Sequence, residues 1–227
     1  MVFPGFPKET LQFLKKLSVH NNRRWFEDNH PDYLGDIVEP ARDFVIAVAP
    51  RLRRIDRELQ AVPAVNGSIM RLNRDMRFFP KQAPFKTHLD FWFWRGAERT
   101  FESSGFFLRL SPTRLTLGAG IRRLKQPTLA RYRTDVFGGK RGEPLVKIVK
   151  SLRNVGYEVG GETYQRPPPG VGFDHPRATL LRHSALYASW ECRYPKEFRS
   201  AAFVDFVSKH FSAVAPLHAW LTQLGNS

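Results

Sequence analysis

Residues 105–119, GFFLRLSPTRLTLGA, decide the fold of this chain. Apolar residues occupy every second position over Gly105–Leu110 and again over Arg114–Ala119, which is the period of a β-strand. The connection at Ser111–Thr113 is short and contains a proline, as hairpin turns often do. The stretch therefore predicts a β-hairpin, and a hairpin requires at least one antiparallel pair of strands.

Two further segments extend this hairpin into a sheet. Residues 89–94, LDFWFW, are apolar on both faces of a strand apart from Asp90, so we expect burial on two sides, including burial of Trp92 and Trp94. Residues 186–193, LYASWECR, alternate as another strand. We predict a mainly antiparallel sheet built from residues 69–119 and 186–193.

The chain before Asp56 has the spacing of helices. Asn22 is placed to cap a short helix that carries Trp25 and Phe26, because its side chain can accept a hydrogen bond from the first turn. A first amphipathic pattern precedes it, at Leu11, Leu14 and Leu17, and the longest one follows it, at Ile37, Ala41, Phe44, Val48, Leu52, Ile55 and Leu59.

Helices also follow the hairpin. Pro127 is suited to a helix start, and Asp174 is placed to cap a helix through Leu181. A closing helix, or a pair of helices broken near Pro216, is expected at the end of the chain. The sequence thus predicts an α+β fold with an N-terminal helical segment and C-terminal helices packed on one face of the sheet. No linker interrupts it, so we expect one domain over residues 1–227, with a helical part over 1–62 and a sheet-containing core over 66–227.

Composition and charge limit the class of protein. The chain has 227 residues, of which 42% are apolar, which is ample for a core, and 36 Lys or Arg against 21 Asp or Glu give a net charge of +15. Such a charge attracts polyanions, including nucleic acid, although it can also reflect a proteome rich in arginine. The single cysteine, Cys192, fits a reducing compartment, and no apolar run suits a membrane span. We expect a cytoplasmic protein with no membrane partner.

Residues 71–88, RLNRDMRFFPKQAPFKTH, are the candidate binding segment. The segment contains five Lys or Arg residues and one carboxylate, that of Asp75, and phenylalanines stand between the charged residues in the sequence. The cations and Asp75 are expected to form one partly buried network that holds an anion. The alternative is a solvated loop rich in arginine. The ligand-binding candidates are Arg74, Asp75, Arg77, Lys86 and His88, with Arg71, Lys81 and Arg122 as secondary candidates.

The same segment resembles a known signature. The run RDMRF at residues 74–78, followed by PFKTH at 84–88, resembles that of a widespread uncharacterised family, known only as a domain of unknown function, whose pattern reads roughly Arg-Asp-x-Arg-Phe-Ser-x-Asp-Lys-x-Pro-Tyr-Lys-Thr. NNRRWF at 21–26, GAG at 118–120 and PPGVGFDHP at 168–176 also fit, so the resemblance spans nearly the whole chain and implies a shared fold. The Ser, Asp and Lys of the pattern fall on Phe79, Lys81 and Gln82, so this chain lacks that polar triplet.

The residue types around the motif suggest separate roles. Asp75 is better suited to orient Arg77 or Lys86 than to act as a base, because cationic neighbours keep it ionised. Lys86 is the best candidate for an ammonium group that faces a ligand, and His88 could transfer protons near neutral pH. Gly118 and Gly120, beside Arg122, either admit a ligand or form a tight turn. No cofactor fingerprint or metal-ligand spacing is present, so we predict no cofactor and no metal.

Three classes of function remain open. The first is a binder of a small phosphate- or carboxylate-bearing ligand, with or without catalysis, that uses Arg74, Arg77 and Lys86. The second is a nucleic-acid-binding protein that exposes aromatic rings such as Trp92 or Trp94 for stacking. The third is a scaffold in which the motif is an internal ion-pair lock. The sequence leaves open whether the protein is an enzyme.

Overall fold

The structure is a computed structural model that describes residues 3–224, and it divides into two compact units. Unit 1 contains the described residues up to Phe93 together with Phe107–Leu117 and Glu191–Lys209, and unit 2 contains Trp94–Phe106, Gly118–Trp190 and the described residues from His210 onward. Each unit is therefore assembled from three separate stretches of the chain. The single domain predicted over residues 1–227 stays a prediction.

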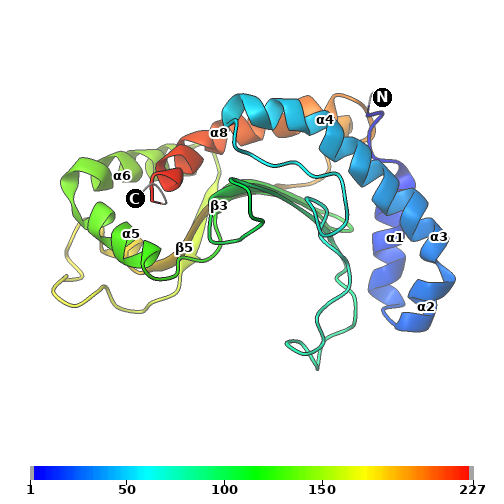
Figure 1. Ribbon diagram of the computed structural model, residues 1–227, viewed down its shortest axis with the longest axis horizontal. Helices are drawn as coiled ribbons and strands as arrows, with labels where there is room; N and C mark the ends of the chain where they lie inside the picture. The colour runs from blue at the N-terminus through cyan, green and yellow to red at the C-terminus, as the bar shows by residue number, and fades with distance from the viewer. Residues whose placement is uncertain (1–2, 225–227) are drawn as a thin grey trace. The chain divides into compact units, whose positions relative to one another are not determined.

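The element order is that of an α+β protein (Figure 1). The helical elements are α1 Lys8–Val19, α2 Arg23–Asp28, α3 His30–Asp32, the π-helix η1 Tyr33–Val38, α4 Glu39–Ile55, α5 Thr128–Phe137, α6 Gly139–Asn154, α7 Ala178–Leu181, the 3-10 helix η2 Lys196–Arg199 and α8 Phe203–Thr222. The strands are β1 Leu89–Trp94, β2 Gly105–Leu110, β3 Leu115–Ile121, β4 Glu158–Glu162 and β5 His183–Cys192. They form one five-stranded antiparallel sheet in the order β1-β2-β3-β5-β4. The predicted fold class is confirmed.

The hairpin forms where the sequence predicts it. β2 has the predicted bounds, and the turn is closed by a hydrogen bond of 2.9 Å from the Ser111 N–H to the Arg114 carbonyl. Trp92 and Trp94 on β1 are both buried, as expected for a strand covered on two faces. At the other edge, β4 pairs with β5 in antiparallel register, with Glu158 opposite Ser189.

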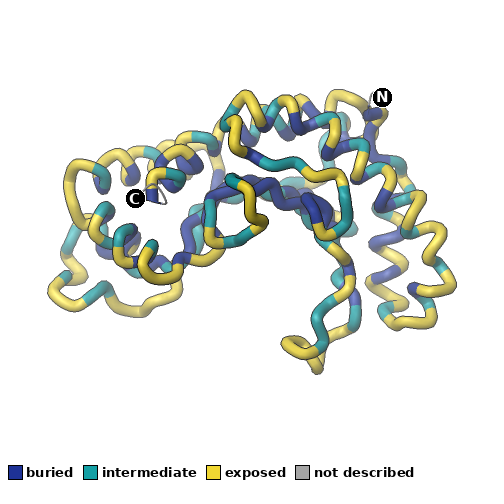
Figure 2. Tube along the Cα trace, viewed as in Figure 1, coloured by how far each residue is buried: buried dark blue, intermediate teal, exposed yellow. Residues whose placement is uncertain are grey.

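The helices of unit 1 follow the predicted caps and periods. The Asn22 side chain accepts a 2.9 Å hydrogen bond from the Trp25 N–H and so caps α2. η1 continues directly into α4, which ends at Ile55, just before Asp56. The buried side chains of α4 recur at three and four residues, and Figure 2 shows the dark buried stripe along it.

Aromatic rings form the centre of unit 1. The Phe6 ring stacks on Phe198, with 5.2 Å between ring centroids, and meets Phe203 edge-on at 5.8 Å. Phe44 of α4 meets Phe91 of β1 edge-on at 5.2 Å, so α4 covers this strand. Edge-on and offset contacts of this kind add to the free energy gained by burying the rings. They attach the N-terminal segment, α4 and the start of α8 to the sheet.

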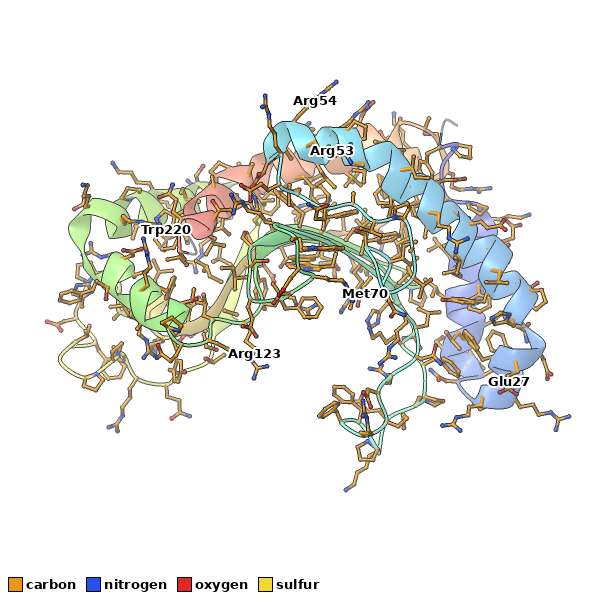
Figure 3. All side chains as sticks on the ribbon, viewed as in Figure 1. Glu27, Arg53, Arg54, Met70, Arg123 and Trp220 are labelled. Atoms are coloured by element: carbon orange, nitrogen blue, oxygen red, sulfur yellow. The ribbon has the colours of Figure 1, made fainter. Side chains whose placement is uncertain are left out.

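Helix-to-helix contacts hold unit 2 together. The Tyr132 hydroxyl on α5 donates to the Leu180 carbonyl on α7 at 2.9 Å. Arg141 on α6 and Trp220 on α8 exchange two hydrogen bonds: Nη2 of Arg141 donates to the Trp220 carbonyl at 3.0 Å, and the Trp220 indole N–H donates to the Arg141 carbonyl at 3.1 Å (Figure 3). The guanidinium carbon also lies 4.8 Å from the Trp220 ring centroid, within range of a cation–π contact.

Two local predictions about helix ends are wrong. Asp174 does not cap a helix, because α7 begins only at Ala178 and Arg177 occupies the cap position without a side-chain bond. Pro216 does not break the last helix, which continues from Phe203 to Thr222 with Pro216 inside it. Pro216 is exposed, so the carbonyl that loses its helical donor can face water.

Within the described residues, each helix is too short or not apolar enough to cross a membrane.

Gly5 provides a test of how the N-terminal segment docks in unit 1. Its φ is +107°, and an added Cβ would lie 2.2 Å from the Ser200 amide nitrogen. We expect Gly5→Ala to lower the free energy of unfolding by at least about 1–3 kcal/mol, the cost of the backbone conformation alone. Chemical denaturation measures this change.

The matched control is Gly35→Ala in η1, because a Cβ at Gly35 meets nothing within 4 Å. This change should alter the free energy of unfolding by less than about 1 kcal/mol. Equal effects of the two substitutions would contradict the tight docking of Gly5 on residues 199–200.

Candidate functional site

The candidate motif folds as a hairpin of its own, residues 72–86, which we call the motif hairpin. The Arg74 N–H donates to the Pro84 carbonyl and the Lys86 N–H donates to the Leu72 carbonyl, both at 2.8 Å. Asn73 and Phe85 form an antiparallel bridge between these bonds. In Figure 1 the hairpin is the long excursion of the chain just before β1. The base of the motif is thus held by hairpin hydrogen bonds, while its end, residues 77–83, is exposed to solvent as the alternative of a solvated loop expects.

Asn21 anchors this hairpin to the helices. Its side-chain amide donates to the Phe85 carbonyl at 3.0 Å, and its side-chain oxygen accepts from the Phe85 N–H at 3.0 Å. One carboxamide therefore satisfies both backbone groups of one residue, as a neighbouring strand would. The Phe85 ring also stacks on Phe26 of α2, with centroids 4.1 Å apart and planes 12° from parallel. The NNRRWF and PFKTH segments thus meet at Phe85.

A cleft of about 440 Å³ lies between α2 and the motif hairpin. It is lined by Arg23, Phe26, Glu27, Asn73, Arg74, Met76, Pro84 and Phe85. Phe26, Met76, Pro84 and Phe85 make part of the wall apolar, while two guanidinium groups and the Glu27 carboxylate supply charge. Nε of Arg74 is buried and makes no hydrogen bond within the described residues. A buried donor without a partner is costly, and it is typical of sites that a ligand completes.

Asp75 and Arg77 form a fork at the end of the motif hairpin. Nε and Nη2 of Arg77 donate to the two carboxylate oxygens of Asp75 at 2.9 and 2.6 Å. The hydrogen bond from the Arg77 side chain holds the pKa of Asp75 at about 2, and Asp75 in turn raises the pKa of Arg77. The expected clamp on Arg77 is therefore present. The expectation of partial burial is wrong for Arg77, because 83% of its side chain is exposed, whereas the Asp75 side chain is 22% exposed.

His88 belongs to a different cluster, at the start of the sheet. Its Nε2 lies 3.3 Å from Oδ2 of Asp90, and Nε of Arg109 on β2 donates to Oδ1 of Asp90 at 2.6 Å. Burial opposes ionisation of Asp90, but the hydrogen bonds from His88 and Arg109 outweigh it and hold the pKa of Asp90 well below its ordinary value. The sequence analysis missed the roles of Asp90 and Arg109. Each is the one charged residue of its strand, LDFWFW or GFFLRL, and that was the available signal.

The remaining candidates are dispersed. Lys86 is half-buried within the motif hairpin, whereas Arg71 and Lys81 are exposed. Arg122 belongs to unit 2, where its guanidinium carbon lies 5.2 Å from the Phe101 ring centroid. The motif hairpin thus brings together the candidates from Arg74 to Lys86, and His88 and Arg122 have their own neighbours.

Gly120 is explained by strand packing. It lies inside β3, and an added Cβ would come within 2.3 Å of the Leu186 carbonyl oxygen on β5. The predicted tight turn is therefore wrong at this residue, because the requirement for glycine comes from the close approach of two strands.

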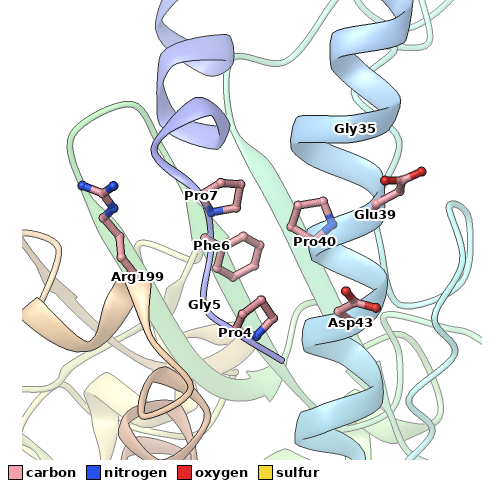
Figure 4. Close-up of a pocket in the computed structure, with 9 residues that line it drawn as sticks. All are labelled: Pro4, Gly5, Phe6, Pro7, Gly35, Glu39, Pro40, Asp43 and Arg199. Atoms are coloured by element: carbon pink, nitrogen blue, oxygen red, sulfur yellow. The ribbon is translucent and has the colours of Figure 1, made fainter. Parts of the chain in front are cut away.

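A second hollow in unit 1, of about 410 Å³, is less suited to an anion (Figure 4). Its wall is formed by the N-terminal segment around Phe6 and by one side of η1 and α4. Glu39 and Asp43 supply two carboxylates there against the single cation of Arg199. Two carboxylates repel an incoming anion. The cleft beside Arg74 is therefore the stronger candidate site.

One of three comparisons with known proteins finds a match. Residues 9–220 match the model of a family described as "Conserved hypothetical protein (DUF2461)". The chain belongs to this family. The match to DUF2461 includes both segments that meet at Phe85. No curated protein and no solved structure matches the chain.

In residues 3–224, no three His, Cys, Asp or Glu side chains come together as ligands of a metal.

Replacing Asn21 tests the anchor of the motif hairpin. Asn21→Ala removes both hydrogen bonds to Phe85, so we expect the free energy of unfolding to fall by about 1–3 kcal/mol. We also expect the Phe85 amide proton to exchange faster with solvent, because it loses its acceptor. Chemical denaturation and amide hydrogen exchange measure the two effects.

The control is Asn22→Ala, which removes the cap of α2 at a cost of about 1 kcal/mol. It leaves the bonds to Phe85 in place, so exchange at Phe85 should not change. If both variants accelerate exchange at Phe85 equally, the anchor is the helix as a whole and not the Asn21 carboxamide.

The carboxylate of Asp90 predicts a pH dependence of stability. The pKa of Asp90 is lower in the folded chain than the ordinary value of about 4. The ionised carboxylate therefore stabilises the folded chain fully above about pH 4, and this stabilisation is lost as the pH falls toward the pKa of the folded chain. We expect Asp90→Asn to lower the free energy of unfolding by about 1.5–3 kcal/mol at pH 7. The difference from the parent should shrink below about pH 4.

Asp75→Asn is the matched control, because it removes a carboxylate that also accepts from an arginine, but from one whose side chain is 83% exposed, so that water screens the pair. Denaturation at pH 7 and pH 3 should show little change for this variant. A pH-independent loss of stability in Asp90→Asn would show that the contribution is one of shape and not of charge.

Proposed function

We propose that this chain binds a small ligand with a phosphate or carboxylate group in the cleft between α2 and the motif hairpin. Arg74 is the principal anchor in this proposal. The observation that carries it is that Arg74 lines the cleft and that its buried Nε makes no hydrogen bond within the described chain. A guanidinium group offers planar, paired donors that match phosphate and carboxylate oxygens.

The rest of the wall suggests what the ligand looks like. Arg23 places a second cation in the cleft, so a group with more than one anionic oxygen is favoured. Phe26 and Phe85 add stacked aromatic surface, which suits an apolar or aromatic body attached to the anion. Glu27 is the one carboxylate among the lining residues, and it would accept a hydrogen bond from the ligand or serve as a base if catalysis occurs.

The proposal assigns ligand binding to fewer of the motif's residues than the sequence predicted. Asp75 and Arg77 satisfy each other, and the carboxylate of Asp90 lies against His88, so these side chains already have partners in the described chain. An internal ion-pair lock accounts for Asp75 and Arg77, but it does not account for Arg74. The anchoring role therefore falls on Arg74, with Arg23 as the second cation.

Replacing Arg74 tests this proposal directly. Arg74→Ala should weaken binding of phenyl phosphate, measured by titration calorimetry, at least tenfold, because the buried donors are lost. Inorganic phosphate should bind more weakly than phenyl phosphate to the parent, since it cannot contact the rings of the cleft.

The matched control is Arg71→Ala. This change removes the same charge from an exposed position that does not line the cleft. It should change the affinity less than twofold. Equal losses in the two variants would mean that general charge, and not the cleft, attracts the anion.

A further inference from the structure

The end of the motif hairpin exposes two adjacent aromatic rings. Phe78 is 74% exposed and Phe79 is 45% exposed, whereas Trp92 and Trp94, which the nucleic-acid-binding alternative would expose for stacking, are buried as the strand pattern predicts. Figure 2 shows this end of the hairpin in the colour of exposed residues. Single exposed rings are common on protein surfaces, but two adjacent phenylalanines at the end of a hairpin form a local apolar patch.

Backbone hydrogen bonds order the turn that carries the two rings. The N–H groups of Phe78 and Phe79 both donate to the Asp75 carbonyl, at 3.0 and 3.2 Å. The Gln82 N–H donates to the Phe79 carbonyl at 3.1 Å and closes the turn. The guanidinium carbon of Arg77, held by Asp75, lies 5.9 Å from the Phe78 ring centroid. The patch is therefore presented on a structured turn, which lowers the entropy lost when a partner binds.

The charge around the rings is positive. Residues 71–88 carry five Lys or Arg side chains and one carboxylate, which is already paired with Arg77. Arg77 and Lys81 flank the two rings in sequence, and both are exposed. The partner of this surface must be anionic and must offer flat apolar groups.

We propose that the end of the motif hairpin is a docking surface for single-stranded nucleic acid. Bases stack on the rings of Phe78 and Phe79, and phosphates of the same strand bind Lys81 and the Nη1 group of Arg77, which the fork with Asp75 does not use. This combination of aromatic rings and cations is the general means by which proteins bind single strands without reading their sequence. A duplex fits less well, because its bases are already stacked on one another.

An anionic membrane is the competing partner, and the structure favours it less. A single myristoyl chain alone gives only marginal membrane binding, and two phenylalanine rings offer less apolar area than that chain. The proposal is also independent of the small-ligand cleft, because Phe78, Phe79 and Lys81 do not line it. The experiments can therefore contradict the binding of nucleic acid without contradicting the binding of a small ligand in the cleft, and the reverse.

The test is fluorescence anisotropy with a labelled 20-nucleotide oligothymidylate, a duplex of the same length and vesicles of phosphatidylserine and phosphatidylcholine. We expect the parent to bind the single strand more tightly than the duplex. The double variant Phe78→Ser, Phe79→Ser should lose at least tenfold in affinity for the single strand. Lys81→Gln should reduce the slope of log affinity against log salt by about 0.7, the value for one lost phosphate contact.

The matched control is the double variant Phe137→Ser, Phe173→Ser, which removes two rings that are 51% and 65% exposed in unit 2. It should keep the parent affinity within twofold. Each hairpin variant should also keep the parent thermal midpoint and phenyl phosphate affinity, which shows that the hairpin is intact. The proposal is overturned if the two double variants bind the single strand equally well, if the duplex binds as tightly as the single strand, or if the hairpin variant loses vesicle binding alone.

Discussion

The paired hydrogen bonds between Asn21 and Phe85 are the interaction on which the candidate site depends. They supply both backbone groups of Phe85 with partners on the side that faces away from its bridge partner, Asn73. The stack of Phe85 on Phe26 then fixes the distance between α2 and the motif hairpin. The cleft beside Arg74 exists because these contacts set one wall against the other. A polar contact and a ring contact at one residue thus define the space that a ligand could enter.

The charges of the motif hairpin differ in how far the protein itself satisfies them. Asp75 and Arg77 are satisfied by each other at the surface, and Asp90 is satisfied by Arg109 and His88 inside unit 1. The Nε of Arg74 makes no such bond among the described residues. Satisfied pairs hold geometry, whereas an unsatisfied buried donor provides free energy for binding. Within the motif hairpin, this difference distinguishes Arg74 from Asp75 and Arg77.

Much of the fold could be predicted from local periodicity, and the site could be predicted only in part. The alternation in GFFLRL gave the bounds of β2, and the Asn22 cap gave the start of α2, because both depend on neighbours in sequence. The pairing of Asp90 with Arg109 depends on the register of two strands, which the sequence alone does not fix. Partial burial of Arg77 was expected from the excess of cations, yet the turn leaves 83% of its side chain exposed. Pro216 shows that a helix can continue through a proline that lies on its exposed side.

The division of the chain into interleaved units has a consequence for synthesis. Unit 1 needs Glu191–Lys209 in addition to its first 93 residues, and unit 2 includes residues from His210 onward. On the ribosome, therefore, neither unit can be completed by the N-terminal half of the chain. The usual order, in which an N-terminal domain folds while the rest is still being made, does not apply. The buried rings of Phe6, Phe44 and Phe91 must wait for Phe198 and Phe203, and during that interval a chaperone could bind them.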